Sequence, residues 1–344
     1  MEYRQLGHND LEVSALGLGT EYLSHQSTET INEVLHLAVD AGINYIDLLW
    51  DDPELWSNFI PAFEQNRNRF TVAAHWGGDF NQLDRCQQYF DGILTRLCNN
   101  YADIGLVTMI DTEVKWKGCA QEALAHLQHY KKRGQIGMIG ASSHYVQLAR
   151  KMVDSGLIDV LMYPINMFRD ADDENKSLFQ ACEDQGVGLV AMKPYAGGSI
   201  FIKTPPISPV QCIHYVLSQP VSTTVIGVKN VEELRAATYY WEASEEEKNF
   251  KVVLENIQHY LVGDCVYCNH CLPCPENINI GLMIHVADTY QYFPKDEIRA
   301  EYEAFAVKAS ACIACGECME RCPFNVDVIA RMRQVVEYLE VVDK

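Results

Sequence analysis

Eight short apolar runs alternate with eight stretches of helical pattern over about the first 240 residues. Strands that alternate with helices form parallel sheets through right-handed crossovers. Eight such units are typical of a closed (β/α)8 TIM barrel, and the sequence predicts this α/β fold for residues 1–244. The apolar runs are 15–19, 43–49, 70–74, 103–109, 136–141, 158–164, 187–194 and 223–228, and the helical stretches are 28–41, 54–65, 82–98, 116–133, 145–155, 174–184, 208–218 and 230–240.

Two short cysteine runs follow, and each ends in Cys-Pro. Four thiolates at such spacing can surround a cube of iron and sulfide, and in two-cluster ferredoxins the fourth cysteine of each run ligates the cluster of the other run. We therefore expect two [4Fe-4S] clusters. The expected ligands are Cys265, Cys268, Cys271 and Cys322 for the first cluster, and Cys312, Cys315, Cys318 and Cys274 for the second.

Structural zinc is the alternative occupant, because paired Cys-x2-Cys elements also make tetrahedral zinc sites. Zinc usually takes two close pairs separated by a longer loop, whereas here three cysteines crowd within seven residues, twice. Disulfides fit less well, because nothing in the sequence suggests export. The other five cysteines fall on expected helices and are interpreted as packing residues; they are Cys86, Cys98, Cys119, Cys182 and Cys212.

The region that holds the cysteine runs is expected to be a second, mostly helical domain of ferredoxin-like type at 245–344. Residues 245–262 predict one helix, with acidic residues in its first turn as the helix dipole favours. Two helical patterns lie on either side of a break at 293–295, and a last helix is expected over 327–340.

The net charge of −20 argues against nucleic-acid or anionic-membrane binding. An acidic surface suits a basic patch on an electron-transfer partner, and it serves equally well for solubility. The first residues lack a basic segment followed by an apolar one, so no signal peptide is apparent. Because the clusters require reduced cysteines, a cytoplasmic location is expected.

The barrel half resembles the aldo/keto reductases in the order of its motifs. The matching segments are RQLGHNDLEVSALGLGT, GINYIDL, YADIGLVTMID, IGMIGASSH, LVAMKPYAGG and TTVIGVKNVEELRAA. Residues 245–340 resemble the ferredoxin-type extension of the iron–sulfur branch of that superfamily, with CVYCNHCLPCP and CIACGECMERCP at the cysteine runs. The resemblance implies an oxidoreductase, and the superfamily transfers hydride from NADPH to a carbonyl through a Tyr, Lys, Asp and His tetrad.

Only the tetrad aspartate is matched, by Asp47. The tyrosine position holds Asp52, the lysine position His75 and the histidine position Thr108. A carboxylate and an imidazole make an acid–base pair that works near neutral pH. We therefore expect Asp52 beside His75, with Asp47 behind, to act as catalytic residues; Asp52 before Pro53 is equally explained as a solvated helix start.

Other residues near the barrel mouth are weaker candidates or form its walls. Trp50, Trp56 and Trp76 are expected to provide an aromatic wall for a planar substrate. His144, Asp111, Arg169 and Lys193 are the weaker candidates, and His144 is also explained as a solvated loop residue.

The cofactor positions of the resembled family are also altered. The carboxamide-binding glutamine aligns with Met162 and the nicotinamide-stacking tyrosine with Met192, while the residue that pairs the 2′-phosphate falls near Glu233 and the adenine-site asparagine at Ala237. A carboxylate facing a 2′-phosphate repels it. The resemblance leaves four candidates for cofactor binding, namely Ser142, Gly198, Gly227 and Lys229.

Three functions remain open. The first is an iron–sulfur oxidoreductase whose clusters pass electrons to or from a small-molecule substrate, or a cofactor such as a flavin, at the barrel mouth, with a redox partner such as ferredoxin or flavodoxin. The second is an NAD(P)H-dependent carbonyl reductase with a remodelled site. The third is a non-catalytic electron-transfer or partner-binding protein, because fold analogy does not decide function.

Overall fold

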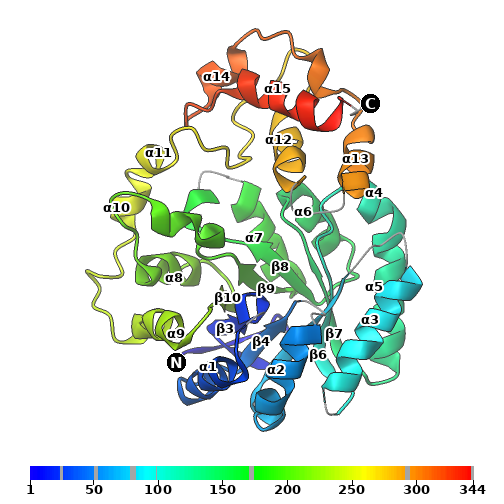
Figure 1. Ribbon diagram of the computed structural model, residues 1–344, viewed down its shortest axis with the longest axis vertical. Coiled ribbons are helices and arrows are strands. Elements are labelled where there is room, and N and C mark those ends of the chain that lie inside the picture. Colours follow the sequence, from blue (N-terminus) through cyan, green and yellow to red (C-terminus); the bar gives the residue numbers. More distant parts are fainter. Residues whose placement is uncertain are drawn as a thin grey trace. The chain divides into compact units, whose positions relative to one another are not determined.

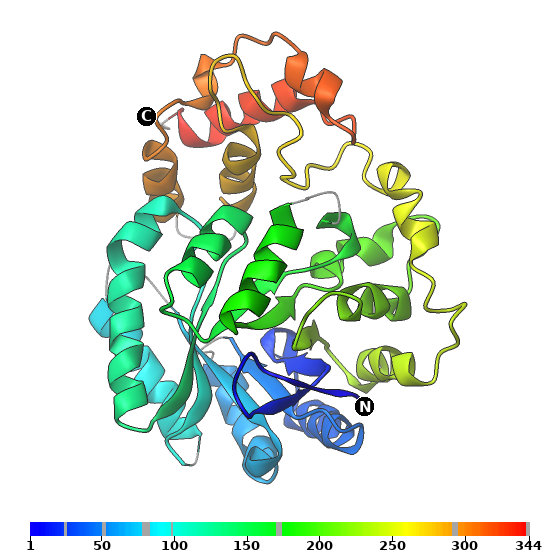
Figure 2. The same cartoon turned by 180° about the vertical axis from the view of Figure 1, so that it is seen from behind.

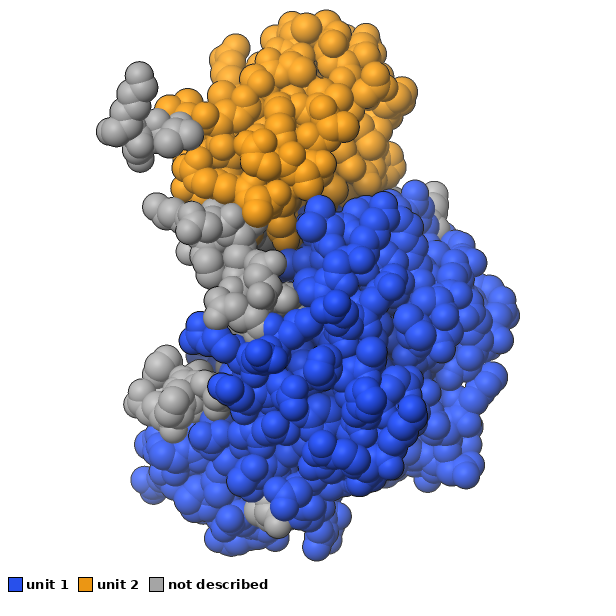
Figure 3. Space-filling view, turned by 90° about the vertical axis from the view of Figure 1, so that its right-hand side faces the viewer, with its two compact units in different colours: residues 1–167, 173–251 blue, residues 168–172, 252–344 orange. Residues whose placement is uncertain are grey.

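The computed structural model describes residues 1–23, 26–49, 53–77, 83–97, 99–169, 174–290 and 295–341. The chain divides into two compact units, coloured separately in Figure 3: residues 1–167 with 173–251, and residues 168–172 with 252–344. The first unit extends to residue 251, beyond the boundary at 244 that the sequence suggested. In this extension, the Phe250 ring packs against His214 and Tyr215 of the first unit.

The first unit is a closed barrel of eight parallel strands, and the predicted fold class is confirmed (Figure 1). The strands run in chain order around the barrel, and the last pairs with the first through Thr224 to Gly227 and Leu16 to Gly19. They are β3 (Leu16–Gly19), β4 (Tyr45–Leu48), β5 (Thr71–Trp76), β6 (Ala102–Val107), β7 (Ile136–Ser142), β8 (Val160–Pro164), β9 (Gly188–Met192) and β10 (Thr223–Gly227).

Helices surround the strands, as Figures 1 and 2 show from opposite sides. Each predicted helix of this half has a counterpart, and the bounds agree within a few residues except near 116. There the chain forms α4 (Glu113–Lys115), a wide turn at Trp116–Ala120 with a kink at Gly118, and then α5 (Gln121–Lys132). The other helices are α1 (Thr28–Asp40), α2 (Pro53–Glu64), α3 (Leu83–Arg96), α6 (Val146–Asp154), α7 (Glu174–Gln185), α8 (Pro209–Leu217) and α9 (Val231–Thr238), with short 3-10 turns at Glu21–Leu23, Arg67–Arg69, Met167–Arg169, Ala196–Ile202 and Tyr239–Trp241.

Local chemistry fixes where these helices begin. The Ser27 hydroxyl accepts a hydrogen bond from the Thr30 N–H at the start of α1. At α8, Ser208 and Gln211 exchange side-chain and backbone bonds as a capping box, and Pro209 occupies the first helical position. These caps satisfy amide groups that have no partner within the helix.

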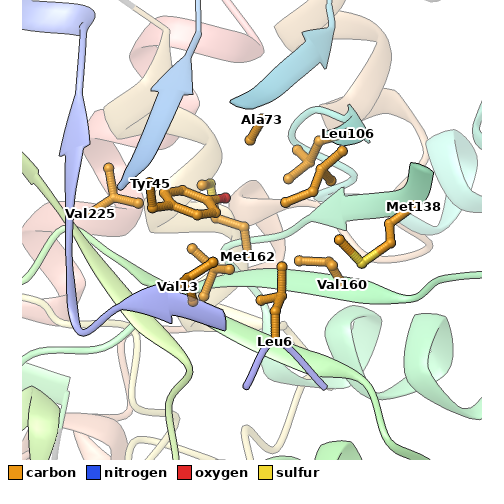
Figure 4. Close-up of a cluster of buried hydrophobic side chains, with 11 residues drawn as sticks. Leu6, Val13, Tyr45, Ala73, Leu106, Met138, Val160, Met162 and Val225 are labelled. Carbon is orange, nitrogen blue, oxygen red and sulfur yellow. The ribbon is translucent and has the colours of Figure 1, made fainter. Parts of the chain in front are cut away.

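A hairpin of β1 (Tyr3–Gln5) and β2 (Glu12–Ser14) precedes the barrel. The first strand expected from the sequence, 15–19, corresponds to β3, and the hairpin before it was not predicted. Leu6 and Val13 flank the hairpin's turn and join the side chains that fill the barrel interior, among them Tyr45 and Met162 (Figure 4). The hairpin thus contributes to the core rather than to the sheet.

The second unit contains short helices joined by long loops. Residues 245–262 do not form the single predicted helix; α10 (Lys251–Leu254) and α11 (Ile257–Tyr260) are separated at Asn256, whose φ of −113° and ψ of 15° are not helical. Helices occur on both sides of the predicted break, whose residues 293 and 294 lie outside the described residues. The last helix is as expected, and α12 packs against α15. The remaining elements are α12 (Ile280–Thr289), α13 (Lys295–Glu303), a turn at Ala309–Ala311, α14 (Glu317–Arg321) and α15 (Val328–Leu339).

No helix in the described ranges is long and apolar enough to cross a membrane.

The cysteines outside the two runs lie where packing residues are expected. Cys86, Cys182 and Cys212 are 1–2% exposed on α3, α7 and α8, and Cys119 is half-buried. Burial raises the pKa of Cys182 and of Cys212 to about 12. Cys98 lies outside the described residues.

The raised pKa values predict the reactivity of these thiols. Because the folded-state pKa is raised, Cys182 and Cys212 stay neutral up to about pH 12, and their alkylation should not increase between pH 7 and 9. Peptide mass spectrometry after iodoacetamide treatment should show Cys119 modified well before either. Modification of Cys182 at the rate of Cys119 in the native protein would contradict this expectation; urea should expose all three.

Candidate functional site

The first cysteine run surrounds a hollow of about 340 Å³ in the second unit. Its walls include Cys265, Cys268 and Cys271 from that run and Cys322 from the other run. Around the sulfur atoms the lining is largely apolar. The structure thus brings together the four cysteines that the sequence predicts for one cluster.

The second hollow, of about 370 Å³, repeats this arrangement. Cys312, Cys315 and Cys318 come from the second run, and Cys274 comes from the end of the first. Each hollow therefore takes three cysteines from one run and the fourth from the other. This is the exchange expected for a two-cluster ferredoxin domain.

Left-handed residues bend both runs around their hollows. Tyr267 and Asn269 have φ near 60°, and Ala314 and Gly316 have φ of 54° and 86°. Positive φ is uncommon for residues other than glycine, and here it turns the backbone back within the short gaps between cysteines. One result is that the Tyr267 N–H donates to the Cys265 sulfur.

Two aliphatic side chains form a wall common to both hollows. Ile280, at the start of α12, and Val328, at the start of α15, line each of them and are 2% and 3% exposed. Next to Ile280, a Cβ on Gly281 would lie 2.5 Å from the Asn269 Oδ1 atom, so a larger residue here would displace the Asn269 side chain. The start of α12 is therefore fitted to the cysteine loops.

The donor set fits two four-iron clusters better than zinc. In the described part of the chain, no three His, Cys, Asp or Glu side chains converge closely enough to hold a single metal ion. A cube that offers one iron to each thiolate accepts sulfur atoms that are spaced apart. Burial raises the pKa of Cys265 to about 11 and that of Cys271 to about 12, so thiolates here need positive metal charge beside them.

At the barrel mouth, three predicted positions meet in one buried hydrogen-bonded group. His75 on β5 places Nε2 2.8 Å from Asp47 Oδ1 at the end of β4, and Nδ1 2.8 Å from Thr108 Oγ1 just after β6. An ionised carboxylate only accepts, so Nε2–H donates to Asp47. In the neutral ring, Nδ1 then accepts from the Thr108 hydroxyl.

This geometry changes the role available to His75. The residue is 1% exposed, Asp47 5% and Thr108 4%, and both ring nitrogens already have partners. His75 therefore reaches a bound molecule only through the Thr108 hydroxyl or the Asp47 carboxylate. Asp52, the residue expected beside it, lies outside the described residues.

A second aspartate–histidine pair lies at the ends of β6 and β7. Asp111 Oδ2 lies 2.8 Å from His144 Nδ1, and Asp111 Oδ1 accepts from the His144 N–H at 2.7 Å. These two bonds fix the orientation of the imidazole. His144 is thus an oriented acid–base candidate rather than a solvated loop residue.

Glu21 belongs to the strand-end positions where catalytic groups are expected, but it was not among the predicted catalytic residues. Its side chain retains solvent access at the mouth, yet burial by surrounding atoms raises its pKa. The charges of Lys193, His75 and His144 lower this pKa, and the charge of Asp47 raises it. Its carboxyl group therefore holds a proton to higher pH than an ordinary glutamate does. The available signal was its position directly after the first barrel strand.

The expected aromatic wall is wrong for the two tryptophans that the structure describes. Trp76 is fully buried and packs against Phe90 and Tyr130 on the outer helices. Trp56 is 4% exposed and contacts Phe59 on its own helix. Both pack within the unit because their rings fill space between elements; Trp50 lies outside the described residues.

Comparison with known families identifies the barrel. The model of the aldo/keto reductase family matches residues 15–211, more than half of the chain. The chain belongs to the aldo/keto reductase family. A model of the 4Fe-4S dicluster domain matches residues 234–327. The protein is therefore an oxidoreductase of this family with a C-terminal dicluster domain, which implies two [4Fe-4S] clusters.

Individual relatives are distant. The uncharacterized oxidoreductase YqkF of Bacillus subtilis is 23% identical over 284 residues, covering 68% of this chain and 89% of that protein. L-galactose dehydrogenase of Arabidopsis thaliana is 25% identical over 232 residues, covering 60% and 69%. An uncharacterized iron–sulfur protein of Methanococcus maripaludis is 33% identical over 73 residues, covering 20% and 15%.

Solved structures share the fold. The holo form of aldo-keto reductase AKR11C1 from Bacillus halodurans superposes with a TM-score of 0.60 at 20% identity, covering 74% of this chain and 96% of that chain. A putative aldo-keto reductase from Pseudomonas has a TM-score of 0.57 at 22% identity, covering 70% and 95%.

The residues at which cofactor binding was expected make contacts within the chain. Glu233 Oε2 accepts from the Lys229 N–H at 2.8 Å, and the Glu233 N–H donates to Asn230 Oδ1 at 2.9 Å. The Tyr22 ring covers Gly227, where a Cβ would meet it at 2.5 Å, and Lys229 Nζ lies 5.7 Å from the centre of that ring.

The other cofactor candidates lie at separate places around the mouth. Ser142 Oγ accepts from the Met109 N–H at 2.8 Å and is buried. Gly198 has φ of 88° in the loop after β9. Met162 is buried in the barrel core and Ala237 is 1% exposed, so neither presents a polar group to a nucleotide.

Double substitutions test the exchange of the fourth cysteine. If Cys322 completes the first hollow, Cys322→Ala should remove no further iron from a Cys265→Ala/Cys268→Ala protein, which has already lost that cluster. In a Cys312→Ala/Cys315→Ala protein the same change should remove most of the remaining iron. Anaerobic iron and sulfide analysis gives the comparison, and the reverse pattern would assign each run its own cluster.

The buried trio at the barrel mouth predicts a stability effect. His75→Ala leaves Asp47 and Thr108 buried without their partner, which costs about 1–3 kcal/mol and more where the group is charged. Asp47→Asn keeps an acceptor oxygen and should cost less. All five tryptophans precede residue 252, so urea unfolding followed by tryptophan fluorescence reports on the barrel unit. An unchanged midpoint for His75→Ala would show that these bonds contribute nothing.

Proposed function

We propose that the protein is an iron–sulfur oxidoreductase in which two [4Fe-4S] clusters exchange single electrons with a substrate or cofactor held at the barrel mouth. The observation that carries the proposal is the pair of four-cysteine hollows, together with a mouth in which His75 is enclosed between Asp47 and Thr108. The clusters supply one-electron transfer when bound. The chain's own residues would bind the reacting molecule and move its protons.

The arrangement of the mouth favours this over hydride transfer to a carbonyl. Protonation of a carbonyl oxygen needs an acid within hydrogen-bond reach, and His75 is enclosed between Asp47 and Thr108. Glu21, with its raised pKa, and the oriented His144 are the acid–base groups closest to this role. The substrate proposed is a small molecule that accepts or donates electrons one at a time.

The second hollow is the better point for electrons to enter or leave. Cys315 is the exposed member of the eight cysteines, and Ile313 beside it is 62% exposed. An electron carrier such as ferredoxin or flavodoxin would dock over this loop. Eight reduced thiolates suit a reducing compartment, and a cytoplasmic setting is part of the proposal.

An NAD(P)H-dependent carbonyl reductase is the second candidate, favoured by Ser142 and by the glycine-containing loop after β9. Against it, the Glu233 carboxylate bonds the Lys229 amide where the family pairs the 2′-phosphate. A glutamate carboxylate at this position would repel the negatively charged 2′-phosphate of NADPH. NADPH should therefore bind poorly, whereas NADH, which has no 2′-phosphate, should not be repelled by Glu233.

Anaerobic titration separates the two candidates. We expect iron and sulfide for two clusters per chain, EPR signals on reduction by dithionite, and no saturable change in NADPH fluorescence. Glu233→Gln should improve NADPH binding if the carboxylate is the barrier, with Glu232→Gln on the same turn as the matched control. Tight NADPH binding by the unaltered protein with turnover of an aldehyde would favour the reductase, and abundant zinc in place of iron would overturn the cluster assignment.

A further inference from the structure

Arg321 connects the two cysteine runs. It ends α14, next to Cys322, and its Nη2 group donates to the carbonyl oxygens of Cys271 at 3.0 Å and Pro273 at 2.6 Å. Its Nη1 group donates to Glu317 Oε2 at 3.3 Å. The turn that it holds lies between Cys271, which lines the first hollow, and Cys274, which lines the second.

One buried donor atom of this guanidinium has no partner. The Nε atom is buried and has no hydrogen-bond partner among the residues that the structure describes. Arg321 also lines the second hollow, together with Cys274, Cys312 and Cys318. A buried donor without a partner is costly, and a ligand in the hollow would supply one.

The first hollow has no arginine in its described lining, although Arg331 acts on Cys265 from outside it, and the second hollow is lined by Glu276 as well as Arg321. The described lining of the first hollow also contains no lysine, and His270 is its only basic side chain. Hydrogen bonds to cluster sulfur atoms and nearby net charge set the reduction potential of iron–sulfur clusters. Among the described lining residues, the second hollow therefore differs from the first in having a buried N–H donor without a partner, the Nε of Arg321.

We infer that Arg321 is a redox-tuning residue, which raises the reduction potential of the second cluster above that of the first by its charge and its remaining N–H donor. A cluster held by Cys274, Cys312, Cys315 and Cys318 would supply one-electron chemistry, taking one electron from an external one-electron donor that is thereby oxidised, with no bond or proton exchanged. Arg321 would stabilise the added negative charge, so the first electron would be expected at the second hollow. This inference rests on the proposed cluster assignment.

EPR-monitored redox titration of the whole chain tests it. Two reduction waves are expected, and the wave altered by Cys315→Ser belongs to the second cluster. Arg321→Gln should lower the equilibrium constant for reduction of the second cluster about tenfold. Its wave would then move about 59 mV to more negative potential, the value for one electron. Arg321→Lys keeps the charge but loses the Nε donor, so its shift should be smaller. Arg299→Gln, which removes a charge from α13 and lines neither hollow, should leave both waves in place.

A second pair of variants covers the case in which Arg321→Gln fails to retain iron. Glu317→Gln removes the carboxylate that offsets the guanidinium, so the second wave should move to more positive potential. Glu320→Gln removes a charge from the same helix without a bond to Arg321 and should move it less. If the protein holds two clusters and neither the Arg321 nor the Glu317 substitution shifts a reduction wave, this inference alone is overturned. If the unaltered protein contains no iron, the cluster assignment is overturned as well.

Discussion

The fourth cysteine of each run in the second unit lines the hollow of the other run. This requires the two runs to lie side by side, and the packing of α12 on α15 is consistent with that arrangement. A unit of this size buries little apolar surface, and metal ligation commonly supplies the missing stability in such small domains. The helices and the ligand set are therefore interdependent.

The barrel was predictable because its signal is repeated eight times. Each apolar run became a strand and each amphipathic stretch became a helix, as the closed ring from β3 to β10 shows. The two cysteine groups followed equally well from spacing alone. In both cases the pattern is local in sequence, and the physical rule that connects it to structure is general.

The failures came from contacts that spacing does not encode. The hairpin of β1 and β2 was not predicted, because Leu6 and Val13 are buried through contacts with residues of the barrel interior that are distant in sequence. Trp76 ends a barrel strand, yet its ring fills space against Phe90 on the outer side. His75 was expected to face a substrate, and only the distances to Asp47 and Thr108 reveal that both nitrogens are engaged. Side-chain direction decided each case.

Ile280 and Val328 separate the two hollows with saturated hydrocarbon, and both are fixed at the starts of helices that pack on each other. An electron that passes between clusters on either side of this wall would cross it by tunnelling through a barrier of constant width. Such a crossing needs no loop movement and no rearrangement of solvent between the clusters. Its rate would depend weakly on temperature and viscosity, so any slow step in turnover would belong to the barrel mouth or to the approach of an electron carrier.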